Sequence, residues 1–149
     1  MTLFDTCDTL TENGIWQSQY DAGQGIIMVP LSIDVVNKIE GLGSVLAAIP
    51  ANTTWEYYVY KRRDIAGASY WDLSAEPVLK FRVYVPAGQN VPVEFWATTR
   101  DPDGTGWNTH VYGNLPIIPG QWNELTIDLR VSTTGPVSDA ALRMVAQLT

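Results

Sequence analysis

The sequence predicts an all-β fold, specifically a β-sandwich of the jelly-roll type with two antiparallel sheets. Short segments of alternating apolar and polar residues recur along the chain, which is the pattern of half-buried strands. Glycine, proline, asparagine and aspartate cluster between these segments, as expected for turns. No segment has convincing helical spacing, and no repeat of fixed period is visible, so a propeller or solenoid is not expected. The 149 residues are predicted to form one domain.

The first half of the chain is predicted to contain four strands. We expect a short strand at 3–10, a strand at 26–36, a buried strand at 44–49 and a strand at 55–62. Pro30 interrupts the second of these, and because proline cannot donate to a ladder it indicates an edge or a bend. Residues 37–43 contain two glycines and are expected to form a turn.

The second half of the chain alternates more cleanly. Strands are predicted at 78–86, 91–100, 108–113, 122–130 and 141–149. In the second of these, Phe95 and Ala97 are expected to face the core because successive side chains on a strand point to opposite faces. The turn DPDGTG leads into the return strand, where we expect Val111 inward and His110 and Tyr112 outward. Residues 131–139 are read as a linker.

One face of the predicted sandwich is unusually rich in aromatic and hydrogen-bonding side chains. The jelly-roll strand order places the strands at 55–62, 141–148, 93–100 and 108–113 side by side. A tryptophan in open water is unfavourable unless something covers it. We therefore interpret this face as a binding surface, whose candidate residues are Tyr58, Tyr60, Arg62, Glu94, Trp96, Thr98, Arg100, His110, Tyr112, Arg143 and Gln147.

Composition supports a folded recognition domain. Aromatic residues make up 11% of the chain, and six Trp and seven Tyr against three Phe favour rings with a hydrogen-bonding tip. The competing interpretation is a β-rich core, since strands also favour aromatic residues. The formal net charge of −7 argues against binding to nucleic acid or to anionic membranes, which require a basic surface.

The compartment is not decided by cysteine content, because Cys7 is the only cysteine and cannot form a disulfide within the chain. No apolar stretch approaches the roughly 20 residues of a membrane span. The N-terminus lacks the basic and apolar regions of a secretory leader. We expect a domain excised from a larger, secreted multimodular protein, since the sequence stops abruptly after an apparent strand.

The chemistry of this face favours a polysaccharide ligand. The C–H faces of pyranose rings are weakly apolar and stack on aromatic rings, while hydroxyls pair with carboxylate, guanidinium and carboxamide groups. Trp96 and Tyr112 are expected to stack on sugar rings, with Tyr58 and Tyr60 as further platforms. Trp71 and Trp107, on loops at the sheet ends, are candidates to close over a ligand.

Several short motifs resemble a known family. They are LFD at 3–5 with Trp16 downstream, EGLGSVLAAI at 40–49, DLS at 72–74 before PVLKFRVYVP, VEFWATT at 93–99 and PGQWNELTIDL at 119–129. With them, the chain resembles the jelly-roll carbohydrate-binding modules appended to polysaccharide-degrading enzymes. The resemblance implies a non-catalytic, monomeric module that binds soluble polysaccharide, such as plant cell-wall β-glucan or hemicellulose, and is tethered to catalytic or cohesin/dockerin-type modules.

The same resemblance implies a structural calcium ion near the acidic N-terminal strand. The matching acidic positions are Asp5, Asp8 and Glu40, and hard cations prefer such oxygen ligands. The chain departs from the family by ending at Thr149, without a further strand that carries a calcium-binding aspartate. Exposed acidic residues in turns are the alternative interpretation of these positions.

Two other classes of function remain open. The outward aromatic residues would equally suit a structural or protein-contacting sandwich, because protein interfaces also use Tyr, Trp and Arg. A small jelly-roll glycosidase would need two facing carboxylates, for which Glu94 and Glu56 are candidates. A polysaccharide lyase would need a base, which His110 could supply with Tyr112 and Arg100 nearby.

Overall fold

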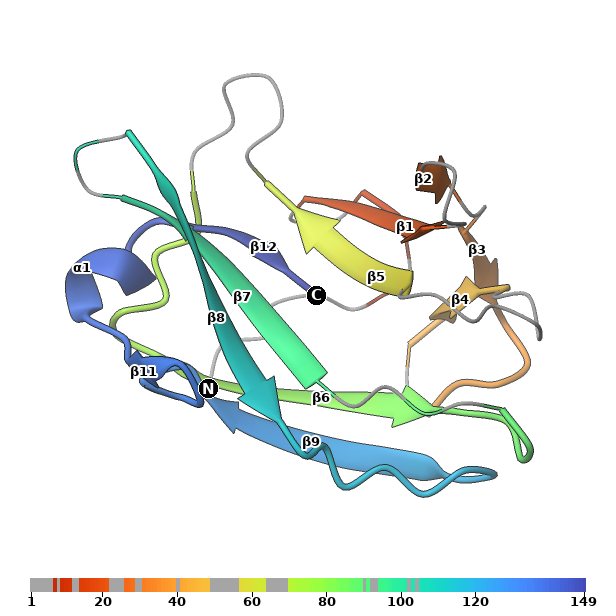
Figure 1. Cartoon of the computed structure of the whole chain (residues 1–149). Coiled ribbons are helices and arrows are strands. Elements are labelled where there is room, and N and C mark those ends of the chain that lie inside the picture. The colour runs from red at the N-terminus through yellow and green to blue at the C-terminus, as the bar shows by residue number, and fades with distance from the viewer. Residues whose placement is uncertain are drawn as a thin grey trace. The chain divides into compact units, whose positions relative to one another are not determined.

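The computed structural model is all-β apart from one single-turn helix in its described part. It describes residues 7, 9–11, 14–21, 26–28, 31–39, 41–48, 57–63, 70–89, 91, 94–101, 103 and 105–149. Contacts divide the chain into two compact units, unit 1 (Met1–Ala66 with Thr149) and unit 2 (Gly67–Leu148). The antiparallel strands within them are consistent with a β-sandwich (Figure 1).

Unit 1 contains two antiparallel groups of strands. Strand β1 (Ile15–Asp21) lies between β2 (Ile26–Met28) and β5 (Tyr57–Arg62). Strand β3 (Leu31–Asp34) pairs with β4 (Ser44–Ala47). Within the strand predicted at 26–36, the structure describes two strands, β2 and β3, which pair with different neighbours.

The turn between β3 and β4 is internally braced and externally apolar. The Asp34 carboxylate accepts hydrogen bonds from the amides of Val36 and Asn37 at 2.7 and 3.1 Å. The Lys38 ammonium donates to the carbonyl oxygens of Gly41 and Leu42 at 3.1 and 3.2 Å. The polar groups thus serve the turn itself, while apolar side chains face solvent: Val35, Val36, Ile39 and Leu42 are 63%, 82%, 47% and 72% exposed.

Two sequence predictions for unit 1 are wrong. Residues 44–49 were expected to form a buried strand, but β4 is only partly buried and its Leu46 is 44% exposed. Of the strand expected at 3–10, the described residues Cys7, Thr9 and Leu10 form bends. Cys7 has φ of 60°, which is incompatible with an extended strand.

Unit 2 contains a three-stranded sheet and a facing pair of strands. The sheet has the order β12 (Val145–Leu148), β7 (Glu94–Arg100), β8 (Trp107–Gly113), which confirms the predicted order of these three strands. The pair consists of β6 (Val78–Tyr84) and β9 (Trp122–Asp128). Figure 1 shows β6 and β9 as a layer beneath β7 and β8.

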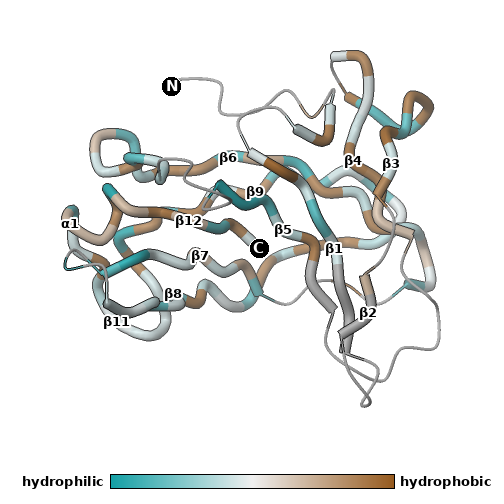
Figure 2. Tube along the Cα trace, turned by 90° about the horizontal axis from the view of Figure 1, so that it is seen from above, coloured by the Kyte–Doolittle hydropathy of each residue, from teal (hydrophilic) through white to brown (hydrophobic). Residues whose placement is uncertain are grey.

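Aromatic rings join these two layers into a core. The rings of Phe81 in β6 and Phe95 in β7 are 5.3 Å apart between centroids, and Phe95 also lies 5.8 Å from Tyr112 in β8. The Tyr112 hydroxyl donates to the carbonyl oxygen of Leu129 at 2.6 Å, which links β8 to the end of β9. Hydrophobic and hydrophilic positions alternate along these strands in Figure 2, as the sequence predicts for β6, β7 and β9.

The C-terminal segment differs from the predicted linker and long strand. Residues 131–136 form a short hairpin of β10 (Val131–Ser132) and β11 (Gly135–Pro136). Helix α1 (Asp139–Leu142) follows, with the Ser138 hydroxyl accepting from the Ala141 amide as its N-cap. Strand β12 is therefore shorter than expected. The register shifts between Val145 and Gln147, and Val145 is fully buried.

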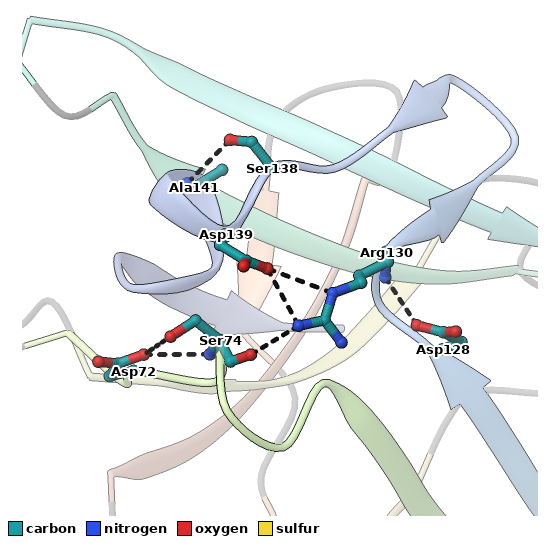
Figure 3. Close-up of polar contacts among 7 residues, drawn as sticks. All are labelled: Asp72, Ser74, Asp128, Arg130, Ser138, Asp139 and Ala141. Carbon is teal, nitrogen blue, oxygen red and sulfur yellow. Dashed lines mark hydrogen bonds and ion pairs between the residues drawn. The ribbon is translucent and has the colours of Figure 1, made fainter.

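Arg130 holds this segment to the rest of unit 2 (Figure 3). Its guanidinium donates to the Asp139 carboxylate at 3.0 and 3.2 Å and to the Ser74 carbonyl oxygen at 2.8 Å. Its backbone amide donates to Asp128 at 3.0 Å. The guanidinium therefore joins the start of α1 to the loop before β6, which lies 56 residues earlier in the chain.

Candidate functional site

The outer face of β7 and β8 gathers two tryptophans and several polar side chains. Directly paired residues of antiparallel strands place their side chains on one face, and the register pairs Arg100 with Trp107 and Trp96 with Val111. Gln147 of β12 pairs with Thr98 on the same side. We define the outer face as Glu94, Trp96, Thr98, Arg100, Trp107, Thr109, Val111 and Gln147.

One end of the outer face is an aromatic and cationic cluster. The Arg100 guanidinium lies 4.6 Å from the centroid of the Trp107 ring, within the range of a cation–π contact. Tyr70 meets the same indole edge to face, with ring centroids 6.3 Å apart and planes at 79°. Trp107 nevertheless remains 47% exposed, so part of its ring is open to a ligand.

The other end of the outer face carries Glu94 and Trp96. The Trp96 indole N–H donates to the Glu94 carboxylate at 2.7 Å, a geometry made possible because residues i and i+2 of a strand share a face. This bond orients the indole and occupies one lone pair of the carboxylate. The remaining lone pairs of Glu94, which is exposed, can accept from hydroxyl groups.

The predicted orientation of β8 is wrong. Tyr112 is only 5% exposed and pairs with Phe95 on the core side, whereas Val111 pairs with Trp96 on the outer face. The reason is that both parities of β8 offer large side chains, and the ring of Tyr112 fills more of the core than Val111 would. Tyr112 therefore cannot serve as the exposed stacking platform that the sequence suggested.

His110 likewise lies on the core side of the sheet. It pairs with Ala97, and its Nε2 is 3.0 Å from the hydroxyl of Thr99, a residue with no exposed surface. Burial lowers the pKa of His110 below its usual value. Arg100 lies on the opposite face, so the arrangement expected for a lyase, with His110 and Tyr112 beside Arg100, is not formed.

Burial changes the Tyr112 hydroxyl as well. Loss of hydration, with a contribution from the negative charge of Asp128, raises the pKa of Tyr112 to about 12. The hydroxyl therefore stays protonated near neutral pH and remains a donor to the Leu129 carbonyl oxygen. This residue serves the core.

The candidate residues of β5 belong to unit 1. Tyr60 is 5% exposed, so its prediction as an exposed platform is wrong, and Arg62 is partly exposed. Tyr58 pairs with Gln19 through the strand ladder. The neighbouring Lys61 is 1% exposed, with its ammonium 5.1 Å from the Trp16 ring centroid, and burial lowers its pKa to about 8.

Arg143 is not a strand residue, contrary to the prediction. It is the C-cap of α1, where its backbone amide donates to helix carbonyl oxygens. The hydroxyl and amide of Ser74 lower the pKa of Asp72, and the positive charge of Arg143 adds a smaller contribution. The positive charge of Arg143 therefore helps to stabilise the ionised carboxylate of Asp72. Trp71, predicted to close over a ligand, is 3% exposed and is paired with Val145 in the core.

The predicted calcium ligands Asp5, Asp8 and Glu40 lie outside the residues that the structure describes. Within the described ranges, no group of three or more His, Cys, Asp or Glu side chains is placed to hold a metal ion. In the DPDG turn, Asp103 accepts hydrogen bonds from the amide and hydroxyl of Thr105 at 3.0 and 2.8 Å. The Asp103 carboxylate therefore has a structural role in the hairpin turn.

Five of the eleven predicted ligand-binding residues lie together on the outer face, and the other six lie on the core side of β8, in unit 1 or at the end of α1. Glu94, Trp96, Thr98, Arg100 and Gln147 are brought together on the outer face. Trp107 was predicted to lie on a loop, and Tyr70 was not among the predicted site residues. The parity of β8 would have revealed Trp107, since it is four residues from Val111 and shares its face.

No family model matches the chain, and no curated protein or solved structure matches it significantly. No helix in the described part of the chain has the length and apolar character needed to cross a bilayer.

Proposed function

We propose that the chain is a non-catalytic carbohydrate-binding module that binds soluble polysaccharide on the outer face of β7 and β8. The observation that carries this proposal is the presence of Trp96 and Trp107 on one face, interleaved with Glu94 and Arg100. Trp107 shares its rung with Arg100, which is four residues from Trp96 along β7. At about 3.4 Å per residue, the backbone positions that carry the two indoles are about 14 Å apart along the strand, a spacing that suits an oligosaccharide better than a single sugar.

The polar groups beside and between the two indoles match the chemistry of sugar hydroxyls. Glu94 accepts, the Arg100 guanidinium donates, and Thr98 and Gln147 can do both. Arg100 also lies close enough to Asp103 for its charge to help lower the pKa of that carboxyl, behind the two hydrogen bonds from Thr105. The face therefore carries both a carboxylate, Glu94, and a guanidinium, Arg100, which favours a neutral polysaccharide such as a β-glucan or a hemicellulose.

We further propose that the module has the jelly-roll topology, acts as a monomer outside the cell, and is joined to catalytic or cohesin/dockerin-type modules. A structural calcium ion bound by Asp5, Asp8 and Glu40 supports its N-terminal region. A purely binding role is favoured over catalysis because His110 lies on the face opposite Arg100, and one oxygen of Glu94 is engaged by the Trp96 indole.

Affinity electrophoresis against soluble polysaccharides tests this function. Mixed-linkage β-glucan, xyloglucan, xylan, mannan, pectin and alginate are each cast into native gels, with and without a chelator. We expect one or two of the neutral polymers to retard the protein without release of reducing ends or unsaturated products. Retardation lost in chelator supports the calcium ion, and retardation by none of the polymers overturns the binding function.

Two variants locate the binding face. Trp96→Ala and Trp107→Ala should each weaken retardation, by about 1–3 kcal/mol in binding free energy if stacking on sugar resembles stacking on other ring ligands. Val131→Ala is the matched control, because Val131 is an exposed apolar residue of β10, 70% exposed and outside the outer face. If both tryptophan variants bind the polymer as tightly as the unaltered protein, the binding site lies on another surface.

A protein-contacting domain is the second candidate function. The observation that favours it is the braced turn between β3 and β4, which presents Val35, Val36 and Leu42 to solvent. Exposed apolar groups of this kind mark interaction surfaces. In that case the protein would show no retardation in any polysaccharide gel, and Val36→Ser would weaken its association with the neighbouring module of its parent protein.

A further inference from the structure

A second aromatic pair lies on the solvent side of the other layer of unit 2. The register of β6 and β9 pairs Tyr84 with Trp122 and Arg82 with Glu124. The residues between them, Val83 and Asn123, face the core. Tyr84 and Trp122 therefore share the outward side of the β6–β9 pair.

The two rings form an open, angled platform. Their centroids are 5.7 Å apart and their planes meet at 51°. Tyr84 is 37% exposed, and Trp122 is partly exposed. Cross-strand aromatic contact stabilises the strand pair, but it leaves ring surface in water that a ligand with an apolar face can cover.

An ion pair stands one outward rung away from the rings. The Arg82 guanidinium donates to the Glu124 carboxylate, with Nη2–Oε2 at 3.2 Å and Nε–Oε2 at 3.3 Å. The two side chains are 39% and 55% exposed, so both retain accessible donors or acceptors. Two residues along a strand span about 7 Å, which places this pair within reach of hydroxyls on a ring that rests on Tyr84 or Trp122.

The backbone at Trp122 is fixed by hydrogen bonds of the neighbouring Asn123 side chain, which points into the core. The Asn123 side chain is 7% exposed and accepts from the Ile118 amide at 2.8 Å. Its amide group donates to the carbonyl oxygens of Ile118 and Gln121 at 3.0 and 2.9 Å. These bonds tie the loop before β9 to the strand, so the platform is formed before any ligand arrives and little ordering entropy is lost on binding.

We propose that Tyr84, Trp122, Arg82 and Glu124 form a second carbohydrate site, which takes a neutral sugar ring. The ring's C–H face packs on the aromatic pair, while its hydroxyls donate to Glu124 and accept from Arg82. Neutral sugar is specified because the ion pair has no net charge, and an ionised ligand would meet one member of like sign at close range. The site does not depend on the outer face of β7 and β8, which lies on the other layer of unit 2.

Fluorine NMR of the full chain labelled with 5-fluorotryptophan tests this site. Each of the six indole signals is assigned with a single Trp→Phe variant, and the protein is titrated with cellohexaose, xylohexaose and mannohexaose. We expect the Trp122 signal to shift and saturate with at least one of these. Tyr84→Ser should weaken the Trp122 titration about tenfold and leave the Trp96 and Trp107 signals unaffected.

Lys80→Ser is the matched control, because Lys80 is exposed on the same face two rungs from Tyr84 and should not alter the titration. A fixed Trp122 signal while Trp96 and Trp107 respond overturns the second site and leaves the proposed function intact. A Trp122 response without Trp96 or Trp107 supports the second site and removes the proposed binding face. No response from any of the three with any hexasaccharide overturns both.

Discussion

At the scale of single residues, the Tyr112 hydroxyl shows how one buried hydrogen bond connects the two layers of unit 2. It donates to the Leu129 carbonyl oxygen at 2.6 Å from a ring that is 5% exposed. Tyr112→Phe keeps the ring contacts but leaves a carbonyl group without this donor. We expect the free energy of unfolding to fall by about 1–2 kcal/mol in urea denaturation.

Tyr84→Phe is the control for this measurement, because Tyr84 has the same chemistry on an exposed surface. Its free energy of unfolding should change by no more than about 0.5 kcal/mol, as is usual for surface substitutions. Equal stability of the Tyr112→Phe protein and the unaltered protein would mean that the hydroxyl bond contributes nothing net.

Lys61 makes stability depend on pH in the alkaline range. Its pKa is about 8 in the folded chain, against 10.5 in the unfolded chain, so between these values the unfolded state binds more protons. The destabilisation from burying this ammonium is complete below pH 8 and is relieved as the pH rises toward 10.5. We therefore expect the free energy of unfolding to rise across this interval, by at most about 1.4 kcal/mol per pH unit.

Lys61→Met should abolish this rise, as measured by urea denaturation at several pH values between 7 and about 10. Lys80→Met provides the comparison, because Lys80 is exposed and should leave the rise unchanged. A parallel pH dependence in the Lys61→Met protein and the unaltered protein would show that another group is responsible. Above pH 10 the raised pKa of Tyr112 acts in the opposite direction, since only the unfolded state then loses the phenol proton.

At the scale of elements, two glycines at the ends of β8 have different roles. A Cβ at Gly106 would collide with the Asp101 carboxylate, which also accepts a hydrogen bond from the Asn108 side chain, and the Asp101 amide donates to the Gly106 carbonyl oxygen at 3.0 Å. Gly106→Ala should therefore open the β7–β8 turn and displace Trp107. We expect a loss of thermal stability and weaker polysaccharide retardation.

Gly113→Ala is the matched substitution at the other end of the strand. The nearest atom to its added Cβ would be a Thr133 methyl carbon at 4.0 Å, an ordinary contact distance. We expect its melting temperature to equal that of the unaltered protein. If Gly106→Ala behaves in the same way, the turn tolerates the extra carbon and the Asp101 contact is not structurally important.

The success of sequence reasoning differs among the strands for a physical reason. In β6, one parity holds Leu79, Phe81 and Val83 and the other holds mostly polar groups, so the buried side is unambiguous. In β8, Trp107 and Val111 alternate with His110 and Tyr112, and alternation alone cannot decide which set is buried. The decision comes from Phe95 and Leu129, which contact Tyr112 from distant parts of the chain.

Local signals also failed where tertiary contacts determine the structure. Helix α1 is only four residues long, too short for a detectable hydrophobic period, and it is stabilised by the Ser138 cap and the Arg130–Asp139 ion pair. Strand β1 was missed because Trp16 and Tyr20 stand among polar residues without strict apolar alternation. On the predicted binding face, the members on β7 were placed correctly, whereas Arg143 was displaced by this unforeseen helix.

At the scale of the whole molecule, charge and exposed apolar surface act against each other. The net charge of −7 keeps copies of the chain apart at low ionic strength. Salt screens this repulsion, and strongly hydrated anions such as sulfate also strengthen apolar contacts. The behaviour of the protein in concentrated salt should therefore be governed by its exposed apolar residues.

The braced turn between β3 and β4 is the feature with the clearest practical consequence. Because Val36 and Leu42 project from a turn whose polar groups are internally bonded, the folded protein should adhere to a phenyl or butyl chromatography resin in ammonium sulfate. The double variant Val36→Ser/Leu42→Ser should elute at a distinctly higher salt concentration, with an unchanged circular dichroism spectrum. Coelution of the two proteins would assign the adhesion to another surface. Such a resin would then purify the chain in its native state by a surface that has no part in sugar binding.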